Sequence, residues 1–321
     1  KDEDFAESGV FLSDTIPSEI IHDVVFNSAD EMWILGSAYD PEADLPPWSS
    51  YLPFKMQLIK KSSNGFQVFD RILNLNTIRF DKSDQLLGLG NKGIHVFKKN
   101  EFITCNVPNL AENAGLNSMV IDDFNRVWVS GVNAGILMFN GDEWKSYTKD
   151  NSILSSNSIS FLTTNGSSVW GLTENQQEIF EISDEQMKLL AFNKDNESTQ
   201  MFYFMEADSD GNLWFASQNT IFVMSSLAVG ADRAVVVPVS NNFQEPFSIR
   251  NIKADNKENL FVLYNANNTT ERKILKIRKT GEIENVSIPS DAKGYDIYTM
   301  SFDSNNQLWI GTTTGVFKIE N

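Results

Sequence analysis

The segment DSNNQLWIGTTTGVFKIEN, residues 303–321, contains the pattern that decides the fold. Asp303 and the polar residues after it favour a tight turn, and a strand centred on Trp309 follows. After a second turn, GVFKI favours another strand. Residues 308–310 are apolar in succession rather than alternately, which predicts a strand buried on both faces. Other parts of the chain must therefore pack against each side of this sheet.

The same pattern recurs six more times, each copy centred on one large apolar residue that we call the anchor. The anchors are Trp33, Leu87, Trp128, Trp170, Trp214, Phe261 and Trp309. Their spacings are 54, 41, 42, 44, 47 and 48 residues. Six positions before the anchor stand Asp81, Asp122, Asp208, Asp255 and Asp303, and Asn27 in a sixth copy. Since Asp and Asn side chains bond the backbone just ahead of them, each copy is predicted to contain a hairpin.

Each copy continues beyond the anchor with two more short strands, such as GILMF and EWKSYT in the third copy. Four strands repeated every 40 to 50 residues predict an all-β chain: a seven-bladed β-propeller of four-stranded antiparallel blades. We expect residues 1–321 to form a single propeller domain. Residues 9–15, GVFLSDT, are expected to pair with residues 316–320 of the last blade and so to close the ring. Helical repeats are excluded because the segments are short and rich in Val, Ile, Phe and Thr.

Composition excludes several classes of function. The formal net charge is −17, with 26 Lys and Arg against 43 Asp and Glu, so the surface would repel a phosphate backbone and nucleic-acid binding is disfavoured. A single cysteine, Cys105, excludes an internal disulfide and a cysteine-based metal cluster. The chain contains no apolar run of the roughly 18 residues that a membrane helix requires, so no membrane insertion is expected.

The combination of Asp, a turn, LWIGT and TGVFKI resembles the two-component regulator propeller repeat of large bacterial sensors, especially those of gut Bacteroidetes. The resemblance is closest at residues 297–319, 117–150 and 75–97, and it extends over essentially the whole chain. It implies a periplasmic or secreted sensor module without catalytic activity, possessing neither cofactor nor metal. Similar propellers in secretion-system accessory proteins imply a structural scaffold as an alternative. Such repeats specify a fold well and an activity poorly.

An enzyme is the other alternative. The segment DSDGNLWF at residues 208–215 resembles the turns of streptogramin lyases, which are also seven-bladed propellers. That resemblance implies a histidine general base and a bound metal, and His22 and His95 are the two histidines available. A Cys105–His95 dyad is disfavoured: if Lys99 and Asn100 form a two-residue turn, Cys105 points to the face opposite His95. We therefore predict no catalytic and no metal-binding residue.

Binding residues are expected where each innermost strand begins, because loops gather there around the mouth of the central channel. This position is eleven residues before the anchor. It holds His22, Asn76, Asn117, Ile159, Tyr203, Arg250 and Tyr298. The repeat of Asn76 and Asn117 is explained by the turn preference of asparagine. The other polar residues vary between blades, so the architecture does not require them and a ligand could use them.

A long loop, SAYDPEADLPPWSSYLP at residues 37–53, is expected on the same face. Its aromatic residues Trp48 and Tyr51 either form a platform for sugar rings or a protein hot spot, or pack beneath the loop itself. The candidate ligand-binding set is therefore His22, Trp48, Tyr51, Tyr203, Arg250 and Tyr298, with Asn76 and Asn117. The expected partner is a small-molecule or glycan ligand, or a protein partner domain.

Overall fold

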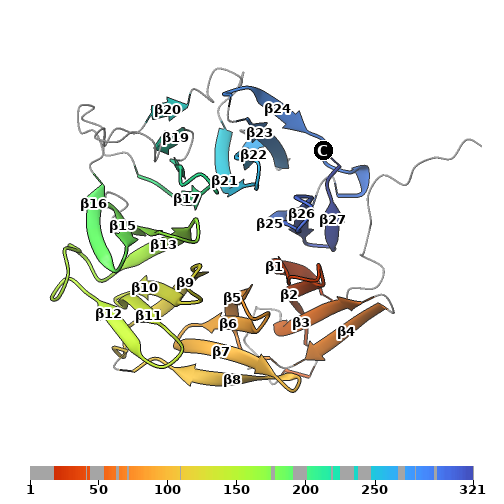
Figure 1. The fold of residues 1–321 in the computed structure, drawn as a ribbon. Helices are drawn as coiled ribbons and strands as arrows, with labels where there is room; N and C mark the ends of the chain where they lie inside the picture. Colours follow the sequence, from red (N-terminus) through yellow and green to blue (C-terminus); the bar gives the residue numbers. More distant parts are fainter. Residues whose placement is uncertain are drawn as a thin grey trace, which may run out of the picture.

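The computed structural model describes residues 18–40, 42–43, 54–62, 65–70, 72–108, 110–174, 178–190, 201–217, 220–224, 235–237, 247–266, 272–278, 280–292 and 295–320. Seven antiparallel sheets stand in a ring around a common centre (Figure 1). Within the described ranges, six sheets have four strands and the seventh has three. The protein is thus the all-β, seven-bladed propeller that the repeat predicts.

The blades are numbered in chain order. Blade 1 contains β1 (Ile20–Phe26), β2 (Met32–Tyr39), β3 (Phe54–Ser62) and β4 (Gly65–Asp70). Blade 2 contains β5 (Leu75–Phe80), β6 (Leu86–Gly90), β7 (Gly93–Lys98) and β8 (Glu101–Asn106). Blade 3 contains β9 (Gly115–Ile121), β10 (Val127–Val132), β11 (Gly135–Phe139) and β12 (Trp144–Tyr147). Blade 4 contains β13 (Ile159–Thr164), β14 (Val169–Thr173), β15 (Ile179–Ser183) and β16 (Gln186–Leu190).

Blade 5 contains β17 (Phe204–Ala207), β18 (Leu213–Ala216), β19 (Ile221–Met224) and β20 (Val235–Val237). Blade 6 contains β21 (Phe247–Ala254), β22 (Leu260–Ala266), β23 (Arg272–Ile277) and β24 (Ile283–Val286). The 3-10 helix η2 (Ser290–Ala292) lies in the connection to blade 7. Blade 7 contains β25 (Ile297–Phe302), β26 (Leu308–Thr312) and β27 (Val316–Lys318).

The first strand of every blade is the innermost one, and the later strands follow outward in chain order (Figure 1). Each innermost strand contacts the innermost strands of both neighbouring blades, and β1 contacts β25. The ring therefore closes between blades 7 and 1. The expected strand at residues 9–15 lies outside the described residues.

The hydrophobic core is divided into seven clusters, one at each interface between neighbouring blades. Every anchor packs in the interface with the blade that follows it; for example, Trp128 joins Leu154 and Leu162 of the blade 3–4 connection and blade 4. At the ring closure, Trp309 of blade 7 packs with Ile21 and Ile34 of blade 1. The repeated tryptophan is thus the side chain that joins one blade to the next.

The second strands are buried on both faces, as their successive apolar residues predict. All residues of β6, β14, β18 and β26 are buried, and so are the first seven of β2. Each second strand pairs with two neighbours in its own sheet, and blades cover both of its faces. Strands of this kind carry no alternation of apolar and polar residues.

Hydrogen bonds explain why Asp and Trp stand six residues apart in the repeat. Asp122 Oδ1 accepts from the backbone N–H groups of Phe124 (3.0 Å) and Arg126 (2.9 Å), which holds the turn between β9 and β10. Its Oδ2 accepts from Trp128 Nε1 at 2.8 Å. Asp208 with Trp214 and Asp303 with Trp309 repeat the indole bond at 2.9 Å. One carboxylate therefore shapes the turn and satisfies the buried indole six residues later.

The same turns also connect neighbouring blades. In blade 2, Asp84 adopts a left-handed conformation (φ 58°) and accepts from the backbone N–H of Ser28 in blade 1 at 2.9 Å. Asp30 of blade 1 does the same for Ser304 of blade 7, accepting from its N–H at 2.9 Å and from its hydroxyl at 2.5 Å. The face that carries these turns is called the turn face. The opposite face, where the innermost strands begin, is called the bulge face.

Candidate functional site

One residue in each innermost strand lies in a β-bulge, where two residues oppose a single residue of the neighbouring strand. The residues skipped in the pairing of first and second strands are His22, Asn76, Asn117, Ser160, Arg250 and Tyr298. In blade 5, Tyr203 donates its N–H to the carbonyl of Ala216 at 2.8 Å, and Ala216 also pairs with Phe204. Seven equivalent positions therefore form a ring, which we call the bulge ring.

Blade 4 corrects the residue expected at this position. Counting eleven residues back from Trp170 gives Ile159, but Ile159 is buried and pairs with Thr173. The hairpin between β13 and β14 is shorter by one residue, because Thr164 pairs directly with Val169. Ser160, ten residues before the anchor, therefore occupies the bulge.

The bulge ring is accessible at the centre of the bulge face, because it lies at the start of the innermost strands (Figure 1). Six of its seven side chains are exposed, and Ser160 is half-buried. A bulge turns one side chain out of the regular alternation of a strand, so these side chains lie outside the apolar packing between blades. The structure brings together six of the eight candidate residues: His22, Asn76, Asn117, Tyr203, Arg250 and Tyr298.

His22 is held in the ring by a hydrogen bond between its Nε2 and Ser37 Oγ at 2.9 Å. Loss of hydration lowers the pKa of its imidazole, and the nearby carboxylate of Asp23 opposes this effect only in part. The imidazole of His22 is therefore uncharged at neutral pH. Asp23 itself is engaged by blade 2, accepting from Thr77 Oγ1 at 2.5 Å and Arg79 Nη1 at 2.7 Å.

Asn76 has a structural role. Its Nδ2 donates to the carbonyl of Leu116 at 2.7 Å and to Asn91 Oδ1 at 3.0 Å. The first bond crosses from blade 2 to blade 3, so Asn76 braces neighbouring blades at the bulge. The sequence explained this asparagine by its turn preference. The structure gives a more specific reason, which is that its amide fits the bulge and also reaches the first strand of the next blade.

The large side chains of the ring are grouped on one side. Tyr203, Arg250 and Tyr298 belong to consecutive blades 5, 6 and 7, whereas blades 2, 3 and 4 contribute two asparagines and a serine. Tyr203 and Tyr298 are 38% and 43% exposed, so their rings are available for stacking. No carboxylate among the described residues forms an ion pair with Arg250. This side of the ring offers two aromatic faces and a cation.

Trp48 and Tyr51 lie outside the described residues. The loop that carries them begins later than expected, because β2 continues through Tyr39. Residues 37–39 are thus a strand rather than the start of a loop. Phe54 opens β3 at the other end of the same connection, and both Tyr39 and Phe54 are about half exposed, at 45% and 44%.

Sequence reasoning missed a wider apolar surface on the bulge face. Of twelve exposed large apolar side chains in the part of the chain that the structure describes, nine lie in the connections or strand ends of this face, and Phe124 lies on the turn face. The nine are Tyr39, Phe54, Leu73, Val132, Ile153, Met201, Tyr203, Tyr295 and Tyr298. Their signal in the sequence is weak, since each is a single apolar residue within a polar connection.

The arrangement offers no nucleophilic dyad at the one cysteine. Lys99 and Asn100 both have positive φ (52° and 67°), as in a two-residue turn, and His95 pairs with Thr104. His95 Nδ1 lies 3.0 Å from Thr104 Oγ1, and Cys105 pairs instead with Ile94. The predicted register is confirmed, so Cys105 and His95 belong to opposite faces of the sheet.

The described residues contain no group of three His, Cys, Asp or Glu side chains arranged to hold a metal ion. In the same ranges, no helix has the length and apolar character needed to cross a membrane.

Residues 292–314 match the family model described as two component regulator propeller. No curated protein matches the chain. Virginiamycin B lyase from Staphylococcus aureus is similar in structure, with a TM-score of 0.67, 14% identity, and coverage of 98% of each chain. The extracellular domain of a hybrid two component system from B. thetaiotaomicron has a TM-score of 0.68 at 14% identity. That match covers 96% of this chain and 40% of the other.

PorZ, a surface component of the type-IX secretion system of Porphyromonas gingivalis, has a TM-score of 0.61 at 14% identity. The match covers 94% of this chain and 46% of the PorZ chain. The TM-scores show a shared fold, but at identities this low they do not show a shared activity. The activity therefore has to be argued from the site itself.

Proposed function

We propose that this chain, a seven-bladed propeller carrying the two component regulator propeller repeat, is a non-catalytic sensor module that binds its ligand at the bulge ring. The observation that carries the proposal is the bulge itself. At one repeated position, each blade presents a side chain outside the apolar packing. Asn76 braces a neighbouring blade, and the other six positions hold His, Asn, Ser, Arg and two Tyr residues. Variation at a position that the fold does not use is typical of recognition.

The chemistry of the ring favours a hydroxylated ligand such as an oligosaccharide. Tyr203 and Tyr298 supply aromatic faces, and His22 and Arg250 supply hydrogen bonds without adding a carboxylate. Exposed tyrosines give contact area at low entropic cost, and an arginine can donate hydrogen bonds to sugar oxygens or, more strongly, to an acidic group. The strands that carry these residues are fixed by their blades, so the ligand would meet a largely preformed surface.

An extracytoplasmic location is part of the proposal. The repeat matched at residues 292–314 and the shared fold with an extracellular sensor domain support it. The match to 40% of that chain fits a module that works together with other domains.

A thermal-shift screen against oligosaccharides tests the proposal. A ligand present at 100 times its Kd stabilises the folded state by about 2.7 kcal/mol, which corresponds to a Tm increase of about 5 °C for a chain of this size. Tyr203→Ala, Arg250→Gln and Tyr298→Ala should each reduce the shift while leaving the Tm of the free protein almost unchanged. Phe124→Ala on the turn face, where the side chain is 67% exposed, is the matched control.

A ligand-induced Tm shift that persists when Tyr203→Ala, Arg250→Gln and Tyr298→Ala are combined would contradict the bulge ring as the binding site. A screen without any shift would exclude the small-ligand version and leave a protein partner, which the exposed apolar side chains of the same face would accommodate.

A lyase-like enzyme is the second candidate, and one observation favours it. His22 lies in the bulge ring with its pKa lowered, so it is a neutral imidazole able to accept a proton. Virginiamycin B lyase, whose fold is shared over the whole chain, is the reference. Metal content distinguishes the two functions: a divalent ion bound in stoichiometric amount, and lost in His22→Ala, would favour the enzyme. Turnover of a streptogramin B antibiotic by wild type but not by His22→Ala would establish it.

A scaffold within an envelope assembly is the third reading, for which the fold shared with PorZ is the support. Saturable ligand binding at the bulge ring would argue against it.

A further inference from the structure

A cleft of about 370 Å³ lies on blade 6, away from the bulge ring. It is formed by the two outer strands β23 and β24 and by the connection to blade 7 that contains η2. The bulge ring, by contrast, uses the innermost strand of this blade. The volume falls within the range of pockets that hold small organic ligands.

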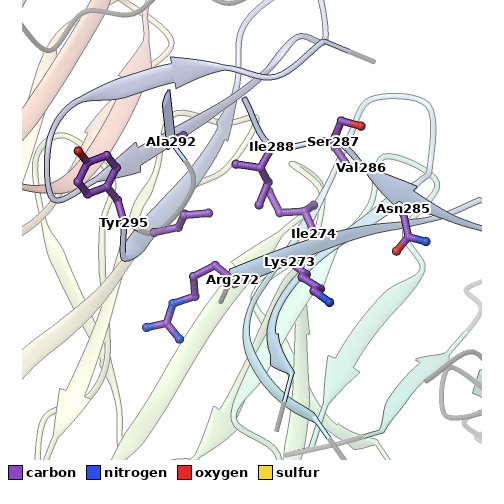
Figure 2. A pocket seen from close by; sticks show the side chains of 10 residues that line it. Arg272, Lys273, Ile274, Asn285, Val286, Ser287, Ile288, Ala292 and Tyr295 are labelled. Atoms are coloured by element: carbon purple, nitrogen blue, oxygen red, sulfur yellow. The ribbon is translucent and has the colours of Figure 1, made fainter. Parts of the chain in front are cut away.

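Half of the ten residues that line the cleft are apolar. Ile274, Ala292 and Ile297 belong to the core between blades 6 and 7, and Val286 and Ile288 pack against that core. Figure 2 shows Ile274 and Ile288 between Tyr295 and Arg272 on one side and Asn285 on the other. The apolar half of the lining would accommodate an apolar ligand body, and the polar half would accommodate a polar group at one end of it.

The charged residues of the cleft are both cationic. Arg272 and Lys273 line it, and its lining contains no carboxylate. This is unusual on a chain whose net charge is −17. Arg272 is already paired with Asp296, so an anionic ligand would have to take the place of that carboxylate.

Arg272 is not fully satisfied by its neighbours. One of its terminal nitrogens donates to Asn265, and the other donates to Asp296 Oδ1 at 2.7 Å. Its Nε is buried and has no hydrogen-bond partner among the described residues. An unmet buried donor is destabilising, and a ligand acceptor that reached it would remove that cost.

Asp296 occupies the place that a ligand carboxylate would take. A carboxylate binds arginine best side-on, with its two oxygens against Nε and one terminal nitrogen. Asp296 reaches only the terminal nitrogen, and its side chain is 49% exposed, so it has room to turn away. Arg272 itself is only 18% exposed, so the exchange would occur in a partly desolvated place where an ion pair is strong.

We propose that this cleft binds a small organic monocarboxylate with an apolar body, whose carboxylate replaces Asp296 on Arg272. The apolar body fills the space between the isoleucines. In the absence of ligand, Asp296 acts as an internal substitute for it.

Isothermal titration of the full chain with phenylacetate, and with phenylacetamide as the neutral match, tests this. Phenylacetate should bind and phenylacetamide should not. Asp296→Asn removes the competing charge while keeping an acceptor for Arg272, so it should tighten phenylacetate binding about tenfold, equivalent to ~1.4 kcal/mol. This gain cannot result from a loss of folding. Arg272→Gln should abolish binding.

Arg250→Gln, in the bulge ring, is the control that separates the two sites and should leave phenylacetate binding unchanged. Equal binding of phenylacetate and phenylacetamide would overturn the proposal. So would the absence of saturable binding, to about 10 mM ligand, in both wild type and Asp296→Asn. Neither result would affect the bulge ring as a separate binding site.

Discussion

Replacing Asp122 tests the account of the repeat most directly. Asp122 is fully buried and accepts four hydrogen bonds: two backbone N–H groups of its turn, the Trp128 indole at 2.8 Å and Arg126 Nε at 2.6 Å. Asp122→Ala leaves the buried indole without a partner and separates Arg126 from its carboxylate. Breaking a buried charged pair of this kind costs about 3 to 5 kcal/mol. For a chain of this size, that lowers Tm by about 6 to 10 °C.

Asp122→Asn separates the two roles of the side chain. The amide oxygen can still accept from the turn, but its NH₂ group faces the indole donor. We expect a loss of about 1 to 3 kcal/mol, intermediate between wild type and Asp122→Ala. In a Trp128→Phe background, which lacks the indole donor, the Asn substitution should cost clearly less, with a coupling of about 1 kcal/mol.

Urea unfolding followed by tryptophan fluorescence gives the free energies for the variants that keep Trp128, and circular dichroism serves for the others. The reasoning would be refuted if Asp122→Asn were as stable as wild type, or if the double-mutant cycle showed no coupling. Blade 1 offers the reverse experiment. There Asn27 replaces the aspartate, its Nδ2 donates to Glu31 Oε2, and the buried Trp33 Nε1 has no partner within the described ranges. Asn27→Asp combined with Glu31→Gln should add about 1 kcal/mol of stability.

Two further predictions concern the closure of the ring and the geometry of the bulge. The hydrogen bonds from the Ser304 hydroxyl and N–H lower the pKa of Asp30 below its ordinary 3.8, so their contribution is complete above about pH 4 and is lost as pH falls through the lowered pKa. The Tm difference between wild type and Asp30→Ala should accordingly shrink in acid; an equal difference at neutral and strongly acidic pH would contradict this. Gly131→Ala places a Cβ 1.8 Å from the carbonyl oxygen of Gly115, which should cost about 3 kcal/mol in urea unfolding, and a neutral result would mean that the innermost strand can move away freely.

The fold could be predicted from sequence because one large residue in each of the seven blades packs against the blade that follows it. An anchor that packs against the next blade has to recur at each blade, whatever the connections between them. Phe261 shows why the pattern tolerates change. It is fully buried at the blade 6–7 interface without an indole N–H, and Asp255 there bonds Asn259 and Asn306 instead.

The candidate site could be predicted only in part. Counting back from the anchor located six bulge residues but failed in blade 4, where Thr164 stands at the position of the usual aspartate. Asn165 and Gly166 form a shorter turn there, and Gly166 has φ 96°. The absence of an aspartate at that position was the signal that the count should change by one.

Other parts of the site depend on contacts between blades, which spacing does not encode. Asn76 reaches Leu116 across a blade boundary, and no local pattern distinguishes it from Asn117. The cleft on blade 6 arises from the distance between an outer strand and a connection, together with the side-chain direction of Arg272. Contacts between blades and the shape of the cleft can be seen only in the three-dimensional structure.

The bulges have a consequence for how such a surface can be altered. With the exception of Asn76, each bulge side chain lies outside the packing between blades because of its own backbone irregularity. These six positions can therefore be exchanged separately without disturbing the blades. A library that randomises His22, Asn117, Ser160, Tyr203, Arg250 and Tyr298 while retaining Asn76 as the brace should consist mostly of folded proteins. The propeller would then serve as a general scaffold on which new specificities are selected, much as variable loops do on an antibody framework.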